Sequence, residues 1–186
     1  MITAPAPAPA RTTRTSVGIS RRAAYAAFGW VLIFVAWHVV WFFTVFRFPQ
    51  SSAHFHGAAV VLYWAVDAIT DVMWAVGIVL PLALGRPWGR RVPRWMLLWA
   101  AWTGCALLGA RGIAGVADEA ARAIGFSGGL TGMPIAQVMG TAHPSAWMSF
   151  AGAATEVLFV AGALMFGLAA LAYQRAFPRP AVSSTS

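Results

Sequence analysis

Four long apolar stretches constrain this chain more than any other feature of its sequence. They cover residues 23–46, 58–84, 95–117 and 147–173. Each is long enough to cross a hydrocarbon core of about 30 Å as an α-helix. With 60% hydrophobic and 10% charged side chains, the 186-residue chain is too apolar for an ordinary soluble domain. We therefore expect an all-α membrane protein, folded as a four-helix bundle.

The basic residues, thirteen arginines, predict how the chain is oriented. Ten of them lie in the two tails and in the segment after the second apolar stretch, which four spans would place on one side. By the positive-inside rule both termini are cytoplasmic, and loops 47–57 and 118–146 face outward. Arginine without lysine in an alanine-rich chain is typical of a high-GC bacterial genome, so the expected membrane is the cytoplasmic membrane of a bacterium. We expect these arginine clusters to contact membrane lipids and no nucleic acid.

The two halves of the sequence are similar, which predicts a duplicated hairpin of helices. Residues 30–37 align with 95–102, and residues 68–77 align with 153–162. The second alignment pairs Asp71 with Glu156 and Trp74 with Phe159. The expected organisation is a cytoplasmic tail, one transmembrane domain containing two repeats, and a second cytoplasmic tail: 1–22, 23–175 (repeats 23–94 and 95–179) and 176–186.

The second outward loop, residues 118–146, is about twenty residues longer than its counterpart in this alignment. Its first part could form a short interfacial helix that ends at Gly128 and Gly129. An insertion on one side of a repeat is either a lid over a binding site or a packing loop without a ligand.

Ionisable side chains inside the apolar stretches form one expected layer. They are His38, Asp67, Asp71, Arg111 and Glu156. At about 1.5 Å per helical residue, they lie roughly 9 to 20 Å from the outer ends of their spans. Because a charge near the bilayer centre costs about 2.5–3.5 kcal/mol, they should face the bundle, pair with one another or line a wet cavity.

The charge of this layer favours proton chemistry. Arg111 with three ionised acids would leave a net charge of minus two, so one or two of the acids should hold a proton or a cation should bind. Asp71 and Glu156 could instead be a symmetric pair of structural helix contacts. Arg111 could form a structural ion pair with Asp67, or extend toward the interface.

Aromatic residues near this layer are the expected walls of a site. Trp64, Asp67, Asp71 and Trp74 share one helical face, so two acids lie between two tryptophans. An aromatic cavity that contains a protonated acid suits a lipophilic olefin or epoxide, because aromatic rings stabilise a carbocation. Core packing would explain the same tryptophans without a ligand.

These patterns leave three functional hypotheses open. The first is an enzyme that cyclises or isomerises a lipophilic, isoprenoid-like substrate by acid–base chemistry. The others are a proton-coupled exporter of small solutes or drugs, working as a homo-oligomer, and a non-catalytic partner subunit. The expected catalytic residues are Asp67, Asp71, Glu156 and His38, and the expected substrate-binding residues are Arg111, Trp37, Trp41, Trp64, Trp74 and Phe159.

In the enzyme hypothesis, Asp71 or Glu156 donates the proton and His38 or Asp67 accepts protons or adjusts the donor. No metal or other cofactor is expected, because the Asp67-x-x-x-Asp71 pair lacks the rest of a magnesium–diphosphate signature. A haem with two histidine ligands would need a second intramembrane histidine besides His38.

Three short motifs give the chain a resemblance to a family of short, four-span actinobacterial integral membrane proteins of unknown function. They are Trp37-His38 with Trp41, Arg111-Gly112, and Glu156 with the helix ending Tyr173-Gln174-Arg175. The resemblance covers most of residues 25–175 and implies no particular activity.

Overall fold

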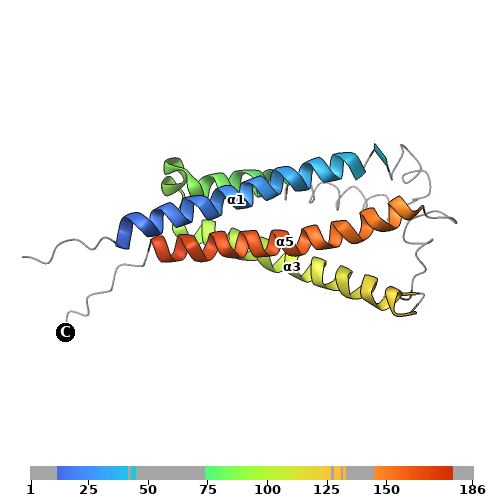
Figure 1. The fold of residues 1–186 in the computed structure, drawn as a ribbon. Helices are drawn as coiled ribbons and strands as arrows, with labels where there is room; N and C mark the ends of the chain where they lie inside the picture. The colour runs from blue at the N-terminus through green and yellow to red at the C-terminus, as the bar shows by residue number, and fades with distance from the viewer. Residues whose placement is uncertain are drawn as a thin grey trace, which may run out of the picture.

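The computed structural model describes residues 12–41, 43–44, 74–126, 128–130, 132 and 145–177, and within these ranges it is helical, with no strand. Its elements are α1 (Thr12–Trp41), the helix Trp74–Gly85, the 3-10 helix η3 (Pro87–Arg91), α3 (Arg94–Ala123) and α5 (Ala146–Ala176). Figure 1 shows the three longest helices running side by side. Those three are long and apolar enough to cross a membrane, α1 from Ser16 onward. The prediction of an all-α, membrane-like protein is confirmed.

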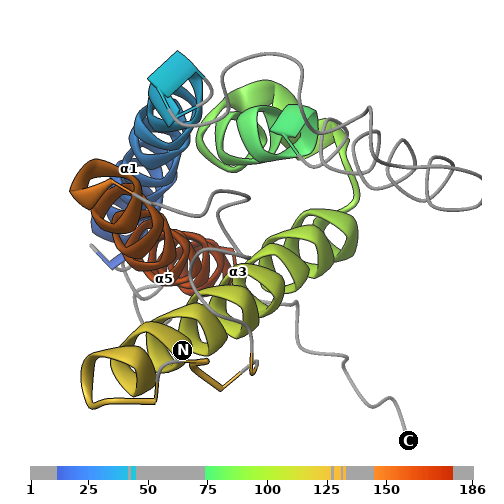
Figure 2. The same ribbon diagram turned by 90° about the vertical axis from the view of Figure 1, so that its right-hand side faces the viewer.

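The central helix is α5, which packs against both α1 and α3. Viewed from one end, α1 and α3 lie on different sides of it (Figure 2). The core along α5 consists mainly of small residues and aromatic rings. Its buried members include Ala24, Ala27, Trp30, Phe34, Ala101, Phe166, Ala169, Ala170 and Tyr173.

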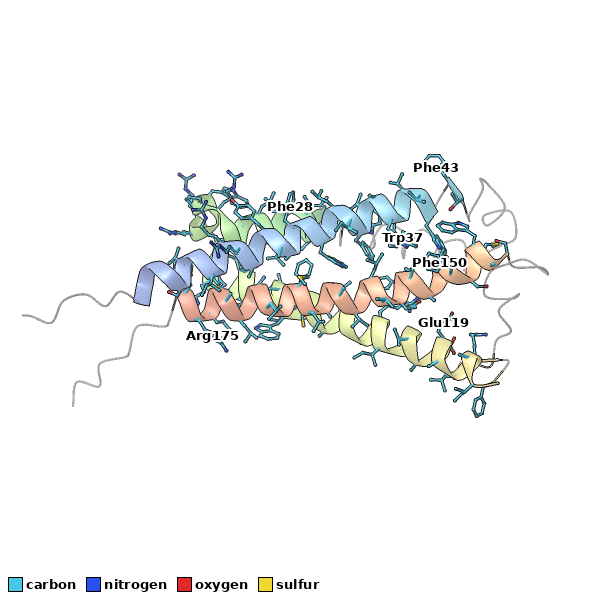
Figure 3. All side chains as sticks on the ribbon, viewed as in Figure 1. Phe28, Trp37, Phe43, Glu119, Phe150 and Arg175 are labelled. Atoms are coloured by element: carbon cyan, nitrogen blue, oxygen red, sulfur yellow. The ribbon has the colours of Figure 1, made fainter. Side chains whose placement is uncertain are left out.

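Most arginines of the described helices lie at one end of the molecule. The start of α1, η3, the start of α3 and the end of α5 share one end, which we call the arginine end (Figure 1). Arg175 marks that end and Glu119 lies at the other (Figure 3). This charge asymmetry is the basis of the positive-inside prediction. Which end faces the cytoplasm stays a prediction.

The second apolar stretch is described only from Trp74 onward, as the helix Trp74–Gly85. The count of four spans and the duplicated hairpin therefore stay predictions. Aligned tryptophans also have different surroundings, since Trp30 is 9% exposed and its counterpart Trp95 is 66% exposed. Whatever its origin, the second half packs differently from the first.

The end of α3 differs from the sequence expectation. The span was expected to end at residue 117, with a separate interfacial helix after it, but α3 continues without interruption to Ala123. It ends before Gly125, whose φ of 105° is a left-handed conformation that glycine adopts without strain. The segment Asp118–Ala123 is therefore the last part of a membrane helix rather than the start of a loop.

Small residues on α3 bring its backbone close to α5. A Cβ atom built on Gly112 would lie 2.6 Å from the backbone nitrogen of Val160, and one built on Gly115 would overlap the carboxyl group of Glu156. Lipid offers no hydrophobic drive for helices to associate, so such close packing is what holds membrane helices together. On the other side of α5, Gly162 leaves the space that the indole of Trp30 occupies.

We predict that Gly112→Ala destabilises the protein, because the added methyl group meets the backbone of α5 at Val160. Overpacking of this kind costs about 1–3 kcal/mol. The matched control is Gly29→Ala on α1, where an added Cβ meets nothing within 4 Å. Thermal unfolding in detergent should show a lower midpoint for Gly112→Ala than for Gly29→Ala; equal midpoints would contradict the close α3–α5 contact.

Candidate functional site

An ion pair between two membrane helices is the main polar feature of the site. Arg111 on α3 binds Glu156 on α5 through both carboxylate oxygens, at 2.5 Å and 2.7 Å. This two-pronged geometry is the strongest arrangement for arginine and a carboxylate. The Glu156 side chain is only 13% exposed, whereas that of Arg111 is 54% exposed.

Local sequence explains why the pair can form. Gly115 lies one turn beyond Arg111, and its missing side chain leaves the space that the Glu156 carboxyl fills. The Arg111 guanidinium also lies over the ring of Phe159, 5.2 Å from its centroid. An aromatic face attracts a cation, so Phe159 stabilises the exposed side of the pair.

His38 is fixed in one orientation by its own helix. Its Nδ1 atom lies 2.8 Å from the carbonyl oxygen of Phe34. Because a carbonyl can only accept a hydrogen bond, Nδ1 carries the hydrogen, and in the neutral ring Nε2 carries the lone pair. Nε2 has no hydrogen-bond partner among the described residues. The backbone contact therefore makes Nε2 the basic nitrogen of the imidazole.

Aromatic rings from three helices surround His38. The ring centroids of Phe34, Trp74 and Phe159 lie 4.1, 5.4 and 6.5 Å from that of His38. Phe34 also contacts Trp74 at 6.1 Å and Phe159 at 5.2 Å. Trp74 and Phe159, which the sequence alignment pairs, therefore pack against the same two residues of α1.

A polar contact also joins α1 to α5, at Thr155, one helical turn before Phe159. The indole nitrogen of Trp37 donates to the hydroxyl of Thr155 at 2.8 Å, and that hydroxyl donates to the carbonyl of Ala151 at 2.7 Å. Trp37 points from α1 toward α5 (Figure 3). This tryptophan, predicted to bind substrate, thus has a structural partner.

The structure brings part of the predicted site together. His38, Trp74, Phe159, Arg111 and Glu156 form one contiguous group, with Phe159 touching members on both sides. Trp37 contacts the α5 part of the site through Thr155, and Trp41 is half-buried at the end of α1. Asp67, Asp71 and Trp64 lie outside the described residues.

One expectation about charge needs correction. Arg111 pairs with Glu156, and its alternative partner Asp67 lies outside the described residues. The expected buried carboxylates are not found in the described part of the chain, because Asp118, Glu119 and Glu156 all retain some exposure. Glu156, predicted as a proton donor, has both oxygens occupied by arginine.

Sequence reasoning missed the residues that support this group. Phe34 connects His38 to Phe159, Thr155 binds Trp37, and Gly115 makes room for Glu156. A signal for the last was present, because small residues recur on one face of α3 at helical spacing. They are Ala101, Gly104, Cys105, Gly109, Gly112 and Gly115.

The described part of the insertion folds back onto α3. Asp118 pairs with Arg122 at 2.8 Å and accepts a hydrogen bond from the backbone of Leu130 at 2.6 Å. Gly129, with a φ of 60°, approaches the same carboxyl group. These contacts favour a packing role for residues 128–130; the rest of the expected lid lies outside the described residues.

Within the described ranges, no three histidine, cysteine or acidic side chains gather as metal ligands would. Comparison with protein families, with curated proteins and with solved structures found no match to this chain. The resemblance to actinobacterial four-span proteins therefore stays an expectation, and function has to be argued from the site.

We predict that Arg111→Gln and Glu156→Gln each destabilise the protein, because each leaves a charge without its partner in a membrane helix. Breaking a buried ion pair lowers the free energy of unfolding by about 3–5 kcal/mol. Because Arg111 is half exposed, we expect a decrease near the lower end of that range. The double variant should be more stable than either single one, as measured by thermal unfolding in detergent. Arg91→Gln is the control, and additive losses in the double variant would contradict the pairing.

We predict that Thr155→Val is more destabilising than Thr44→Val. Both threonines accept from a tryptophan, Trp37 at 2.8 Å and Trp147 at 3.1 Å, but only the Thr155 contact is shielded between helices. A shielded indole N–H without a partner costs about 1–3 kcal/mol, whereas an exposed one finds water. Equal unfolding midpoints for the two variants would show that the Trp37 contact is not important for stability.

Proposed function

We propose that the protein is a membrane enzyme that moves protons on a lipophilic substrate at the His38 site. One observation carries the proposal: the backbone contact of His38 Nδ1 leaves Nε2 with the lone pair, and Nε2 has no partner among the described residues, which place three aromatic rings beside the imidazole. A base on an apolar wall has no obvious role in packing alone. It suits a hydrocarbon substrate that must lose a proton.

The simplest reaction of this kind is the isomerisation of a carbon–carbon double bond. An acid adds a proton to one carbon, and a base removes a proton from the carbon next to the resulting cation, so the substrate's composition is unchanged. In our proposal His38 Nε2 is the base, and the rings of Trp74 and Phe159 stabilise the intermediate positive charge. Cyclisation uses the same acid, base and aromatic wall.

The proton donor in this proposal is Asp67 or Asp71. Glu156 is a poor candidate because Arg111 occupies both of its oxygens. Arg111 is the only arginine within the four apolar stretches of the sequence, and it pairs with Glu156. In the sequence Asp71 precedes Trp74 by three residues, and Trp74 contacts His38.

We predict that His38→Gln and Asp67→Asn abolish activity without unfolding the protein. Loss of a general base or acid lowers rates by about 10²–10⁴-fold. The measurement is untargeted lipid profiling of a deletion strain that carries the wild-type gene, either variant or Thr44→Val. The control residue, Thr44, follows His38 by six positions in the sequence, and its side chain is exposed.

Wild type and Thr44→Val should restore a lipid species that both variants fail to restore. Melting profiles in detergent must show that the variants remain folded. Identical lipid profiles with and without the wild-type gene would contradict an enzyme acting on lipids, and restoration by His38→Gln would remove His38 from the mechanism.

A partner subunit is the second candidate, because α3 exposes large apolar side chains that no other described element covers. Trp95 and Trp99 on this helix are 66% and 69% exposed, and Arg111 is exposed on the same helix. A half-exposed arginine inside a membrane helix suits a contact with another polypeptide. Under this alternative, Arg111→Gln would weaken co-purification of a second membrane protein while His38→Gln would not.

A further inference from the structure

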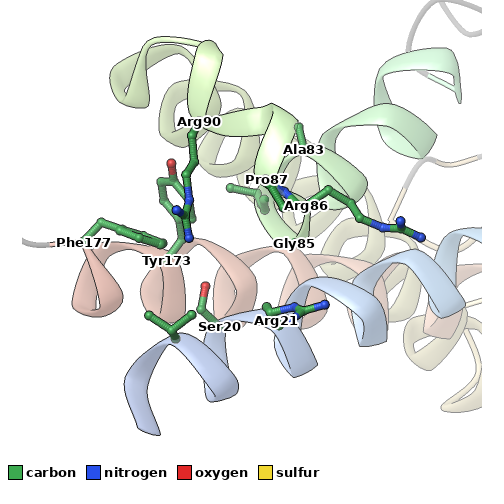
Figure 4. Close-up of a pocket in the computed structure, with 11 residues that line it drawn as sticks. Ser20, Arg21, Ala83, Gly85, Arg86, Pro87, Arg90, Tyr173 and Phe177 are labelled. Carbon is green, nitrogen blue, oxygen red and sulfur yellow. The ribbon is translucent and has the colours of Figure 1, made fainter. Parts of the chain in front are cut away.

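A pocket lies at the arginine end, away from the His38 site. It has a volume of about 100 Å³, enough for several water molecules or one small polar group. Figure 4 shows it between α1, the turn that follows the helix Trp74–Gly85, and the end of α5. Its walls are Val17, Ser20, Arg21, Ala83, Leu84, Gly85, Arg86, Pro87, Arg90, Tyr173 and Phe177. We call it the arginine pocket.

The arginine pocket is strongly positive. Arg21 from α1 and Arg86 and Arg90 from the turn line it, and no acidic residue is among its walls. Arg21 and Arg86 come from segments far apart in the sequence, yet both line the same pocket. The described acids are far away in the fold, in the outer part of α5 and at the opposite end of α3.

A buried hydroxyl group in the same pocket lacks a partner. Ser20 is 2% exposed, and its Oγ atom has no hydrogen-bond partner among the described residues. The hydroxyl points from α1 toward the space below Arg90 and Tyr173 (Figure 4). Buried polar groups are almost always satisfied, so this hydroxyl indicates that a polar group belongs in the pocket.

The backbone around the pocket is fixed by close packing. A Cβ atom on Gly89 would overlap the carbonyl of Ala83, so only glycine allows the η3 turn to fold back on the preceding helix. This turn sets the positions of Arg86 and Arg90. The Arg90 guanidinium lies 5.7 Å from the ring centroid of Phe177, which ties it to the end of α5.

We propose that the arginine pocket binds the phosphate group of an anionic lipid headgroup. Arginine and serine supply hydrogen-bond donors and positive charge, and phosphate supplies acceptor oxygens and negative charge. The pocket lies at the ends of helices that are long and apolar enough to cross a membrane, and the ends of such helices reach the lipid headgroups. A neighbouring groove shares Arg90, Tyr173 and Phe177 and adds Arg91 and Arg94, which extends the basic surface. This site is independent of the His38 site.

The test uses the purified full chain in nanodiscs of phosphatidylcholine, with phosphatidylglycerol added in steps. Lipid retention is read by native mass spectrometry and stabilisation by thermal unfolding, for wild type, Arg90→Gln and Ser20→Ala. The matched control is Arg175→Gln, which removes one arginine at the same end of the molecule but outside both pockets. A parallel arm adds inorganic phosphate in place of phosphatidylglycerol.

Wild type and Arg175→Gln should retain phosphatidylglycerol, and Arg90→Gln should retain it about tenfold less well, because a charged hydrogen bond is lost. Ser20→Ala should also bind more weakly while melting no lower than wild type without lipid. Equal loss in Arg175→Gln and Arg90→Gln would overturn the proposal in favour of diffuse attraction, as would unchanged binding by Ser20→Ala. Stabilisation by inorganic phosphate alone, dependent on Arg90, would overturn a lipid as the source.

Discussion

The close approach of α3 to α5 is the contact on which the rest of the structure depends. Gly112 lets the α3 backbone touch that of Val160, and Gly115 opens the space in which Glu156 meets Arg111. Bulkier residues at either position would separate the helices and break the two-pronged geometry of the ion pair. Steric and electrostatic complementarity are thus provided by the same few residues of α3.

The ion pair in turn determines the character of the aromatic group beside it. A single charge there would be costly in a membrane, whereas Arg111 and Glu156 together are neutral and leave no polar oxygen unsatisfied. Phe159 contacts both the guanidinium and the Phe34–His38 pair. Among the described residues, His38 therefore lies among aromatic rings, one of which also contacts this neutral ion pair.

The fold class was predictable because it follows from length and apolarity, which are local properties of the sequence. The α5 span was expected at residues 147–173 and the helix covers Ala146–Ala176. The end of α3 was not predictable from apolarity, because Asp118 and Arg122 neutralise each other at helical spacing and let the helix continue. Hydropathy alone marks where a membrane core ends, not where a helix ends.

The site was predictable as a set of residues but not as a set of pairs. Periodicity placed Glu156 and Phe159 on one face of a helix, and depth placed Arg111 and His38 at a similar height. Choosing Glu156 over Asp67 as the partner of Arg111 requires the packing of α3 on α5, which the sequence alone does not give. The glycines of α3 carried this information, since small residues mark the face along which membrane helices approach.

The two aligned halves of the sequence differ in the charges that they carry. Glu156 corresponds to Asp71 at an offset of 85, but Arg111 corresponds to Phe46 at an offset of 65, so the first half has the acid without the arginine. If both halves arose from one hairpin, the arginine was gained or lost in one half only. The half that has Arg111 uses its acid to join two helices. An acid without such a cation is freer to exchange a proton with a neighbouring base, and this asymmetry is the reason to look for the proton donor at Asp71 or Asp67 rather than at Glu156.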